Sequence, residues 1–141
     1  MIIEKQNLFG KRQISLVKPQ ETEKGVFIRR GVLLTKDGAF LVHYTDDLET
    51  LYKMLGCSCI DIVTRSVKRK KFDFIIDDEG RMKDGNHIQA VSSLGSEVLL
   101  GNILIAGLAD EDGDLTDLSG MDLGRIAPSI YDGHILIYDL F

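Results

Sequence analysis

Short stretches of alternating apolar and polar residues, separated by tight turns, constrain the fold of this chain more than any other feature. Residues 26–35 and 39–44 show the period of two that is typical of strands, and a Lys-Asp-Gly turn separates them. Glycine accepts the positive φ that a tight turn requires, so this pair predicts a β-hairpin. Residues 59–67 and 72–77 form a second pair around a basic turn. Hairpins of this kind predict antiparallel strands.

One segment, residues 46–55, has the pattern of an amphipathic helix. Asp46 can accept a backbone N–H as the N-cap, and Glu49 three residues later completes a capping box. Gly56 supplies the helix stop. The apolar residues that recur at helical spacing are Leu48, Leu51, Tyr52 and Leu55.

The remaining segments predict shorter elements. Residues 88–94 predict a short helix, and residues 97–108 predict a long strand or two strand pieces bent at Gly101. Residues 123–126 add a helical turn, and residues 134–140 predict a last strand. Because strands outnumber helices, the expected fold is α+β, with a small mixed or antiparallel sheet, one clear helix and one or two short helices.

The charge of the chain is unevenly distributed. Residues 1–71 hold 14 of the 17 basic residues, whereas residues 72–141 hold 14 of the 22 acidic ones. This asymmetry indicates either an electrostatic partner surface, including head-to-tail self-association, or two halves that interleave in one sheet. Because the net charge is −5 and duplex nucleic acid requires a broad positive face, we expect no general affinity for duplex nucleic acid.

The cysteines, histidines and apolar runs limit which cellular compartment and which metal or disulfide chemistry we expect. Cys57 and Cys59 are too close in sequence to form a structural disulfide, which agrees with a reducing compartment. The three histidines show no metal-ligand spacing, so neither a metal nor a cofactor is expected. The longest apolar runs are too short to span a bilayer, and the first residues lack a signal-peptide pattern. We expect a cytoplasmic protein.

The second half carries residues of a known family. They are the turn Asp78-Glu79-Gly80-Arg81-Met82-Lys83 with Asn86, and the later Gly101-Asn102-Ile103-Leu104-Ile105. Over residues 30–127 this order resembles domain-of-unknown-function family 3846, which is common in bacteriophages and mobile elements. The resemblance implies a phage accessory protein and no settled activity. We expect a single domain over 1–141, with an arm or edge strand at 1–25, the family core at 26–127 and a strand extension at 128–141.

Three groups of residues are candidates for binding. The loop at 81–87 combines the cations Arg81 and Lys83 with the amide of Asn86, although Asn86 is equally suited to cap the following helix. The basic turn with Arg65 and Arg69 suits either a phosphate or a solvated hairpin tip. Tyr44 and Tyr52 offer rings for base stacking, although Tyr52 also fits a core-facing position. The predicted ligand-binding residues are Arg65, Arg69, Arg81, Lys83, Asn86, Asn102 and Tyr44.

An acidic loop at 110–117 lacks the spacing of a calcium-binding EF-hand. Position six counted from Asp110 is Leu115 and position twelve is Met121, where the motif needs glycine and glutamate. The loop therefore predicts a solvated acidic hairpin.

Catalytic motifs are absent from the sequence: it has neither a nucleophile elbow nor a phosphate-binding glycine loop. We expect a non-enzymatic phage counter-defence protein that sequesters an anionic nucleotide signal of the cyclic or linear ADP-ribose type, or a cyclic dinucleotide. The ligand would lie in a pocket formed by a homo-oligomer. The alternatives are a protein–protein inhibitor of a host defence nuclease with an acidic surface, and an enzyme that degrades the same signal.

Overall fold

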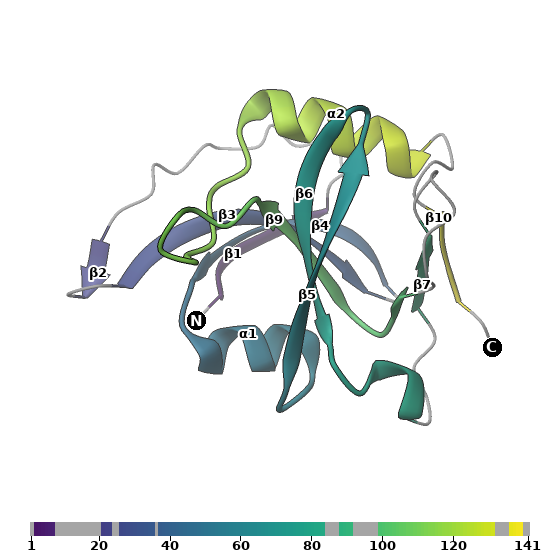
Figure 1. The fold of residues 1–141 in the computed structure, drawn as a ribbon, viewed down its shortest axis with the longest axis horizontal. Helices are drawn as coiled ribbons and strands as arrows, with labels where there is room; N and C mark the ends of the chain where they lie inside the picture. Colours follow the sequence, from purple (N-terminus) through teal and green to yellow (C-terminus); the bar gives the residue numbers. More distant parts are fainter. Residues whose placement is uncertain are drawn as a thin grey trace.

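The computed structural model describes residues 2–7, 21–23, 26–35, 37–83, 88–91, 99–131 and 136–139. These residues form a seven-stranded antiparallel sheet, a three-stranded sheet and two α-helices, which confirms the expected α+β class. The two α-helices lie on opposite sides of the large sheet (Figure 1).

Strands far apart in sequence are neighbours in the large sheet. Its order is β1-β4-β3-β9-β6-β5, and β2 pairs with β3 outside this path. Because β9 lies between β3 and β6, the basic and acidic halves of the chain interleave, as one of the two sequence interpretations predicted. The strands are β1 (Ile2–Asn7), β2 (Glu21–Glu23), β3 (Val26–Thr35), β4 (Gly38–Thr45), β5 (Ile60–Val67), β6 (Lys70–Asp77) and β9 (Ile103–Gly107).

Both predicted hairpins are confirmed, and they turn by different means. Between β3 and β4 the pairing ends at Thr35 and Gly38, and Gly38 has a φ of 134°. Between β5 and β6 it ends at Val67 and Lys70, although no glycine stands in the turn.

The three-stranded sheet contradicts the helix predicted over 88–94 and decides between the two alternatives for the segment that follows it. Its order is β10-β7-β8, with β7 at Ile88–Val91, β8 at Leu99–Leu100 and β10 at Leu136–Asp139. The helix predicted over 88–94 is wrong, because β7 pairs with both β8 and β10. Within the predicted segment 97–108, the described residues from 99 onward contain two strands, β8 and β9, and Gly101 between them has a φ of 92°.

The N-cap of the helix α1 (Leu48–Leu55) lies one residue later than predicted. Asp47 is the N-cap, and its carboxylate accepts a hydrogen bond from the Thr50 N–H at 3.1 Å. Asp46 is occupied elsewhere, since it accepts from Arg29 Nε at 3.0 Å. Gly56 ends the helix in the left-handed region with a φ of 64°, as predicted.

The helix α2 (Gly120–Tyr131) is much longer than the helical turn predicted at 123–126. Ser119 and Asp122 form a reciprocal capping box, in which each side chain accepts from the backbone N–H of the other residue. A 3-10 turn, η1 (Gly80–Met82), follows β6. None of the helices in the described part of the chain has both the length and the apolarity needed to cross a membrane.

Two apolar clusters cover the two faces of the large sheet. Val32 and Leu34 of β3 belong to the cluster that contains Ile126 of α2. Leu33, between them, belongs to the cluster that contains Leu51 and Leu55 of α1. Successive side chains of a strand point to opposite faces, so a sheet covered on both faces has continuous apolar runs in its central strands.

Candidate functional site

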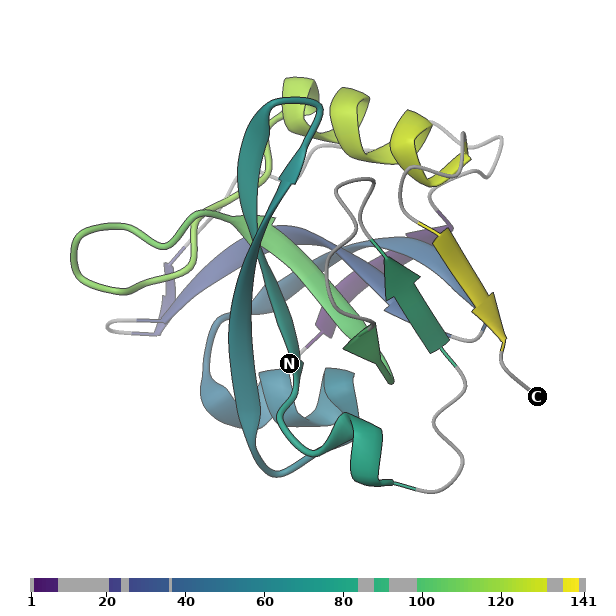
Figure 2. The ribbon, with the colours of Figure 1, turned by 45° about the vertical axis from the view of Figure 1, so that its right-hand side comes forward.

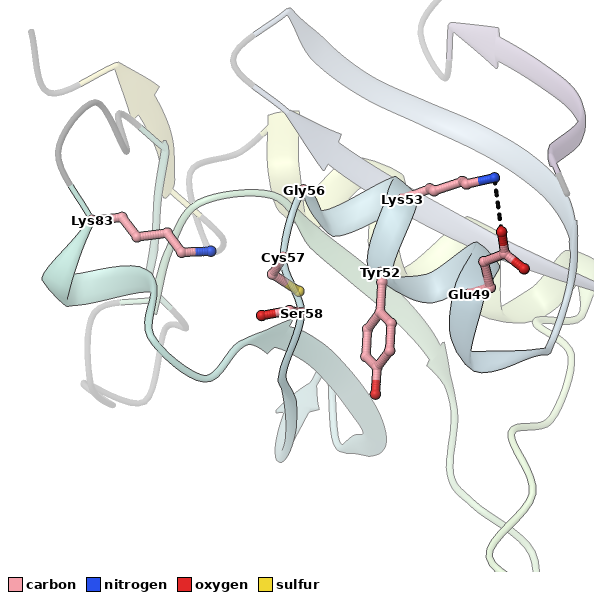
Figure 3. A pocket seen from close by; sticks show the side chains of 7 residues that line it. All are labelled: Glu49, Tyr52, Lys53, Gly56, Cys57, Ser58 and Lys83. Atoms are coloured by element: carbon pink, nitrogen blue, oxygen red, sulfur yellow. Dashed lines mark ion pairs between the residues drawn. The ribbon is translucent and has the colours of Figure 1, made fainter.

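An open pocket lies at the C-terminal end of α1 (Figure 3). Its volume is about 500 Å³. Helix α1, the segment that follows it and the residue after η1 together provide its walls. The lining residues are Glu49, Tyr52, Lys53, Gly56, Cys57, Ser58 and Lys83.

The end of α1 places these residues. The left-handed Gly56 turns the chain, and the Cys57 N–H donates to the Tyr52 carbonyl at 3.0 Å. Asn102 fixes the same helix end from β9's side, because its Nδ2 donates to the Met54 carbonyl at 2.9 Å. Carbonyls in the last turn of a helix have no partner within the helix, so both bonds stabilise the geometry of the pocket.

The two lysines of the pocket differ in how firmly an ion pair holds them. Lys83 Nζ lies 2.7 Å from the carboxylate of Asp77, a buried residue, and the hydrogen bond to Asp77 raises the pKa of Lys83. Lys53 pairs with Glu49 at 3.1 Å, but both side chains are about three-quarters exposed (75% and 77%). Exposed pairs of this kind contribute little, so Lys53 can leave Glu49 at small cost.

The side chains point in different directions around the pocket. Lys83 reaches toward Cys57 and Ser58, whereas Lys53 points away from them toward Glu49 (Figure 3). The ring of Tyr52 stands beside Cys57 and is half-buried. The pocket thus offers an aromatic face, a hydroxyl and an anchored ammonium group.

The environment of the Cys57 thiol in this pocket disfavours its ionisation. Burial raises the pKa of Cys57, and the nearby Asp77 carboxylate raises it further. Because only the thiolate attacks, this environment disfavours nucleophilic catalysis. Cys57 and Cys59 are both free, as the sequence predicted.

The structure does not bring the predicted binding residues together. Lys83 lies just after η1, whereas Arg65 and Arg69 lie at the opposite end of the β5–β6 hairpin, beside α2 (Figure 2). Asn102 donates to the Met54 carbonyl of α1 and so has a structural role. Asn86 and the side chain of Arg81 lie outside the described residues.

Tyr44 is not on the surface, which corrects its prediction as a stacking residue. Its side chain is fully buried in the cluster beneath α1, and its ring crosses Gly31, where an added Cβ would lie 3.2 Å from the ring. Burial raises the pKa of Tyr44, and the carboxylate of Asp117 raises it further. Among the described residues, the buried hydroxyl of Tyr44 has no hydrogen-bond partner.

Six of the seven pocket residues were not among the predicted binding residues: Glu49, Tyr52, Lys53, Gly56, Cys57 and Ser58. Among them, Tyr52 offered a ring for base stacking, and Gly56 was recognisable as the helix stop. Lys53 and Ser58 are distinguished in the sequence only by lying within three residues of Gly56.

Residues 110–114 of the acidic loop are exposed, as predicted, whereas Leu115 is buried and Asp117 is half-buried. The Asp110 carboxylate accepts from the N–H groups of Asp112 and Asp114 at 3.0 Å each, which makes the loop a side-chain-stabilised turn. Carboxylate oxygens of these three residues lie within 4.8 Å of one another.

Comparison with known proteins gives one match. No curated protein and no solved structure matches the chain. The family profile described as a domain of unknown function, DUF3846, matches residues 28–127. This match covers more than half of the chain and includes α1, the pocket residues and the sheet strands β4, β5, β6 and β9. The chain therefore belongs to the DUF3846 family.

Proposed function

We propose that this protein is a non-enzymatic binding protein that holds a nucleotide-derived anion in the pocket at the end of α1. The ligand classes are cyclic or linear ADP-ribose derivatives and cyclic dinucleotides. The observation that carries the proposal is the pairing of a half-buried aromatic ring, Tyr52, with an anchored ammonium group, Lys83, on one pocket.

Each group has a role in this proposal. The Tyr52 ring stacks on a base, because base–aromatic stacking tolerates any base. Lys83 meets a phosphate while Asp77 holds it in position. Lys53 turns from Glu49 to a second phosphate at small cost. Burial and the Asp77 carboxylate raise the pKa of the Cys57 thiol, so the proposal gives this thiol no role as a nucleophile.

The biological setting is part of the proposal. The phage setting implied by the family resemblance favours counter-defence, in which the protein sequesters an immune signal in the cytoplasm of an infected bacterium. The pocket is open to solvent, so a bound nucleotide would keep much of its surface wet. A second copy that closes the pocket would reduce this exposure, which favours a homo-oligomer.

The experiment is retention of ligand followed by its recovery. The protein is incubated with each nucleotide class, freed of unbound ligand and heated, and the released compound is analysed by mass spectrometry. An unaltered nucleotide supports sequestration, an altered mass shows an enzyme, and no retention of any compound rejects the proposal.

Matched variants at one position locate the site. Tyr52→Phe keeps the ring and should retain ligand, whereas Tyr52→Leu removes the stacking face and should lose about five-fold or more in affinity, in line with stacking contributions of roughly 1–3 kcal/mol. Equal affinity of Tyr52→Leu and the unmodified protein would place the ligand elsewhere.

A second candidate function is inhibition of a host defence nuclease by direct contact. The supporting observation is the exposed acidic loop with Asp110, Glu111, Asp112 and Asp114. A basic nucleic-acid-binding surface would attract this loop, with affinity that falls steeply as salt rises. Replacing the four acids by their amides should abolish capture of the nuclease and leave ligand retention unchanged.

A further inference from the structure

A second surface, separate from the pocket, projects at the tip of the β5–β6 hairpin. It contains Lys68, Arg69 and Lys71, all exposed, and we call it the basic tip. Across the described part of the chain, the ion pairs leave these three cations without a carboxylate partner. The tip lies beside α2, at the opposite end of the hairpin from η1 and Lys83 (Figures 1 and 2).

The backbone of the basic tip adopts a conformation that its residues disfavour. Lys68 has a φ of 48° and Arg69 a φ of 70°, and these are the positive-φ residues other than glycine in the described chain. Two positive φ values between the paired Val67 and Lys70 are the mark of a type I′ turn, for which Asn-Gly is strongly preferred. Strained backbone of this kind is concentrated at functional sites. The presence of two long cationic side chains in this turn therefore points to a binding role.

The surroundings hold the basic tip rigidly. Arg125 of α2 donates through Nη1 to the Lys68 carbonyl at 3.1 Å. Lys70 forms an ion pair with Asp122, whose side chain is buried and also belongs to the capping box of α2. Lys70 and Arg125 thus fasten the turn to the helix, and the cations of the basic tip extend from a fixed backbone.

The two faces of the hairpin are not equally accessible. Phe72 lies in the cluster that contains Ile126, so the face that carries Phe72, its cross-strand partner Arg65 and Lys70 is the one beneath α2. Lys71 is the neighbour of Phe72 along the strand and points to the other face. Ligand can therefore reach the turn and one face of the ribbon.

We propose that the basic tip binds the phosphodiester backbone of single-stranded nucleic acid. Its three side chains are purely cationic and carry no apolar anchor, which suits phosphates and lacks the aromatic or aliphatic centre of a protein interface. A duplex groove would present phosphates to both faces of the ribbon, and α2 covers one of them. The net charge of −5 also opposes the broad contact that a duplex requires.

Fluorescence anisotropy with a labelled twelve-nucleotide DNA strand tests this proposal directly. The same RNA strand, the DNA duplex and labelled polyglutamate are the competing probes. We expect both single strands to bind at low salt, with a slope of log affinity against log salt of about −2 for three phosphate contacts. Preferential binding of the duplex or of polyglutamate, or no binding of either strand, would overturn the proposal.

The decisive variant removes charge without removing the turn. Lys68→Asn/Arg69→Gly installs the preferred turn residues, so its melting temperature should equal or exceed that of the unmodified protein. Its affinity for the single strand should fall at least five-fold. The charge-conserving Lys68→Arg/Arg69→Lys should bind normally, and so should Lys5→Gln, which removes one exposed cation on β1. Unchanged affinity of the Asn-Gly variant contradicts the proposal, whatever the pocket at α1 binds.

Discussion

At the scale of single residues, Asp47 shows how one carboxylate organises the start of a helix. It accepts from the Thr50 N–H at 3.1 Å, from the Thr45 hydroxyl at 2.6 Å and from the Thr50 hydroxyl at 2.8 Å. The hydrogen bond from Thr45 contributes most to lowering the pKa of Asp47, and the bonds from Thr50 lower it further. Together they favour the charged form and bring the pKa to about 2. The start of α1 depends on this cap, and α1 in turn carries several residues of the pocket.

Replacing Asp47 should therefore destabilise the protein in a pH-dependent way. At pH 7, Asp47→Ala should lower the free energy of unfolding by about 1–2 kcal/mol, since it removes the N-cap. The folded pKa lies below the unfolded one, so the contribution of the charge is complete above pH 4 and is lost as the pH falls toward 2.

Urea unfolding between pH 2 and pH 7 measures this effect. Asp47→Asn keeps an acceptor at the cap but cannot ionise, so its stability difference from the unmodified protein should shrink below pH 4. A difference that stays constant across this range would show that the charge of Asp47 has no part in stability.

The turn at Lys68 and Arg69 should become more stable when its residues are changed. Positive φ at two residues with side chains costs of the order of 1 kcal/mol each. Lys68→Asn/Arg69→Gly should therefore raise the free energy of unfolding by about 1–2 kcal/mol, measured by urea unfolding at neutral pH. Single replacement of the exposed Lys53 by Asn, on a helix, offers the contrasting case and should not stabilise.

The sequence limits residue-scale prediction where neighbours have similar chemistry. Asp46 and Asp47 both suit a helix cap, and only the position of Arg29 across the hairpin decides which one remains for the helix. Tyr44 follows the strand pattern equally well as a surface or a core residue. Its burial depends on α1 packing over that face of β4, which no local pattern specifies.

At the scale of elements, the chain after β9 crosses closely over the sheet. The Gly107 N–H donates to the Thr116 carbonyl at 3.1 Å, and the Arg30 N–H donates to the Asp117 carboxylate at 2.8 Å. An added Cβ at Gly107 would lie 2.2 Å from Thr116 Oγ1 and 3.1 Å from the Asp117 carbonyl oxygen. The crossing thus requires glycine at the end of β9.

Gly107→Ala should destabilise the protein by about 1–3 kcal/mol, the usual cost of overfilling a well-packed site. Gly120→Ala is the matched control, because a Cβ at Gly120 meets nothing within 4 Å. Thermal unfolding followed by circular dichroism should show a lower melting temperature for the first variant alone. Equal melting temperatures would mean that residues 116 and 117 shift at no cost.

Prediction of elements succeeded where the signals were local. Gly56 and the periodic leucines specified α1, and Gly38 specified the first hairpin. It failed over 88–94, because the described part of this segment, Ile88–Val91, is a strand that pairs with β8 and β10. The helical turn predicted at 123–126 was shorter than α2. This helix continues through Gly124 and Pro128, although both residues disfavour helix interiors.

At the scale of the whole molecule, β9 joins two parts of the large sheet that would otherwise be separate. It pairs with β3 on one side and β6 on the other. Its residues Ile103, Leu104 and Ile105 are fully buried and reach both apolar clusters. The order of strands that produces this arrangement could not be predicted, because strand patterns do not specify partners.

A chain truncated after Val98 should fail to fold cooperatively. It retains both hairpins but lacks the strand that connects them, so each sheet half loses its central neighbour. We expect a broad, weak thermal transition by circular dichroism and poor dispersion of amide signals by NMR. A sharp transition in the truncated chain would show that the β3–β4 and β5–β6 hairpins can associate directly.

The central place of β9 also has a consequence for synthesis on the ribosome. Both hairpins leave the exit tunnel well before β9, so for a time each presents an open edge and bare apolar faces to the cell. Translation speed and ribosome-associated chaperones should then decide how much newly made protein reaches its native form, more than the stability of the finished molecule does.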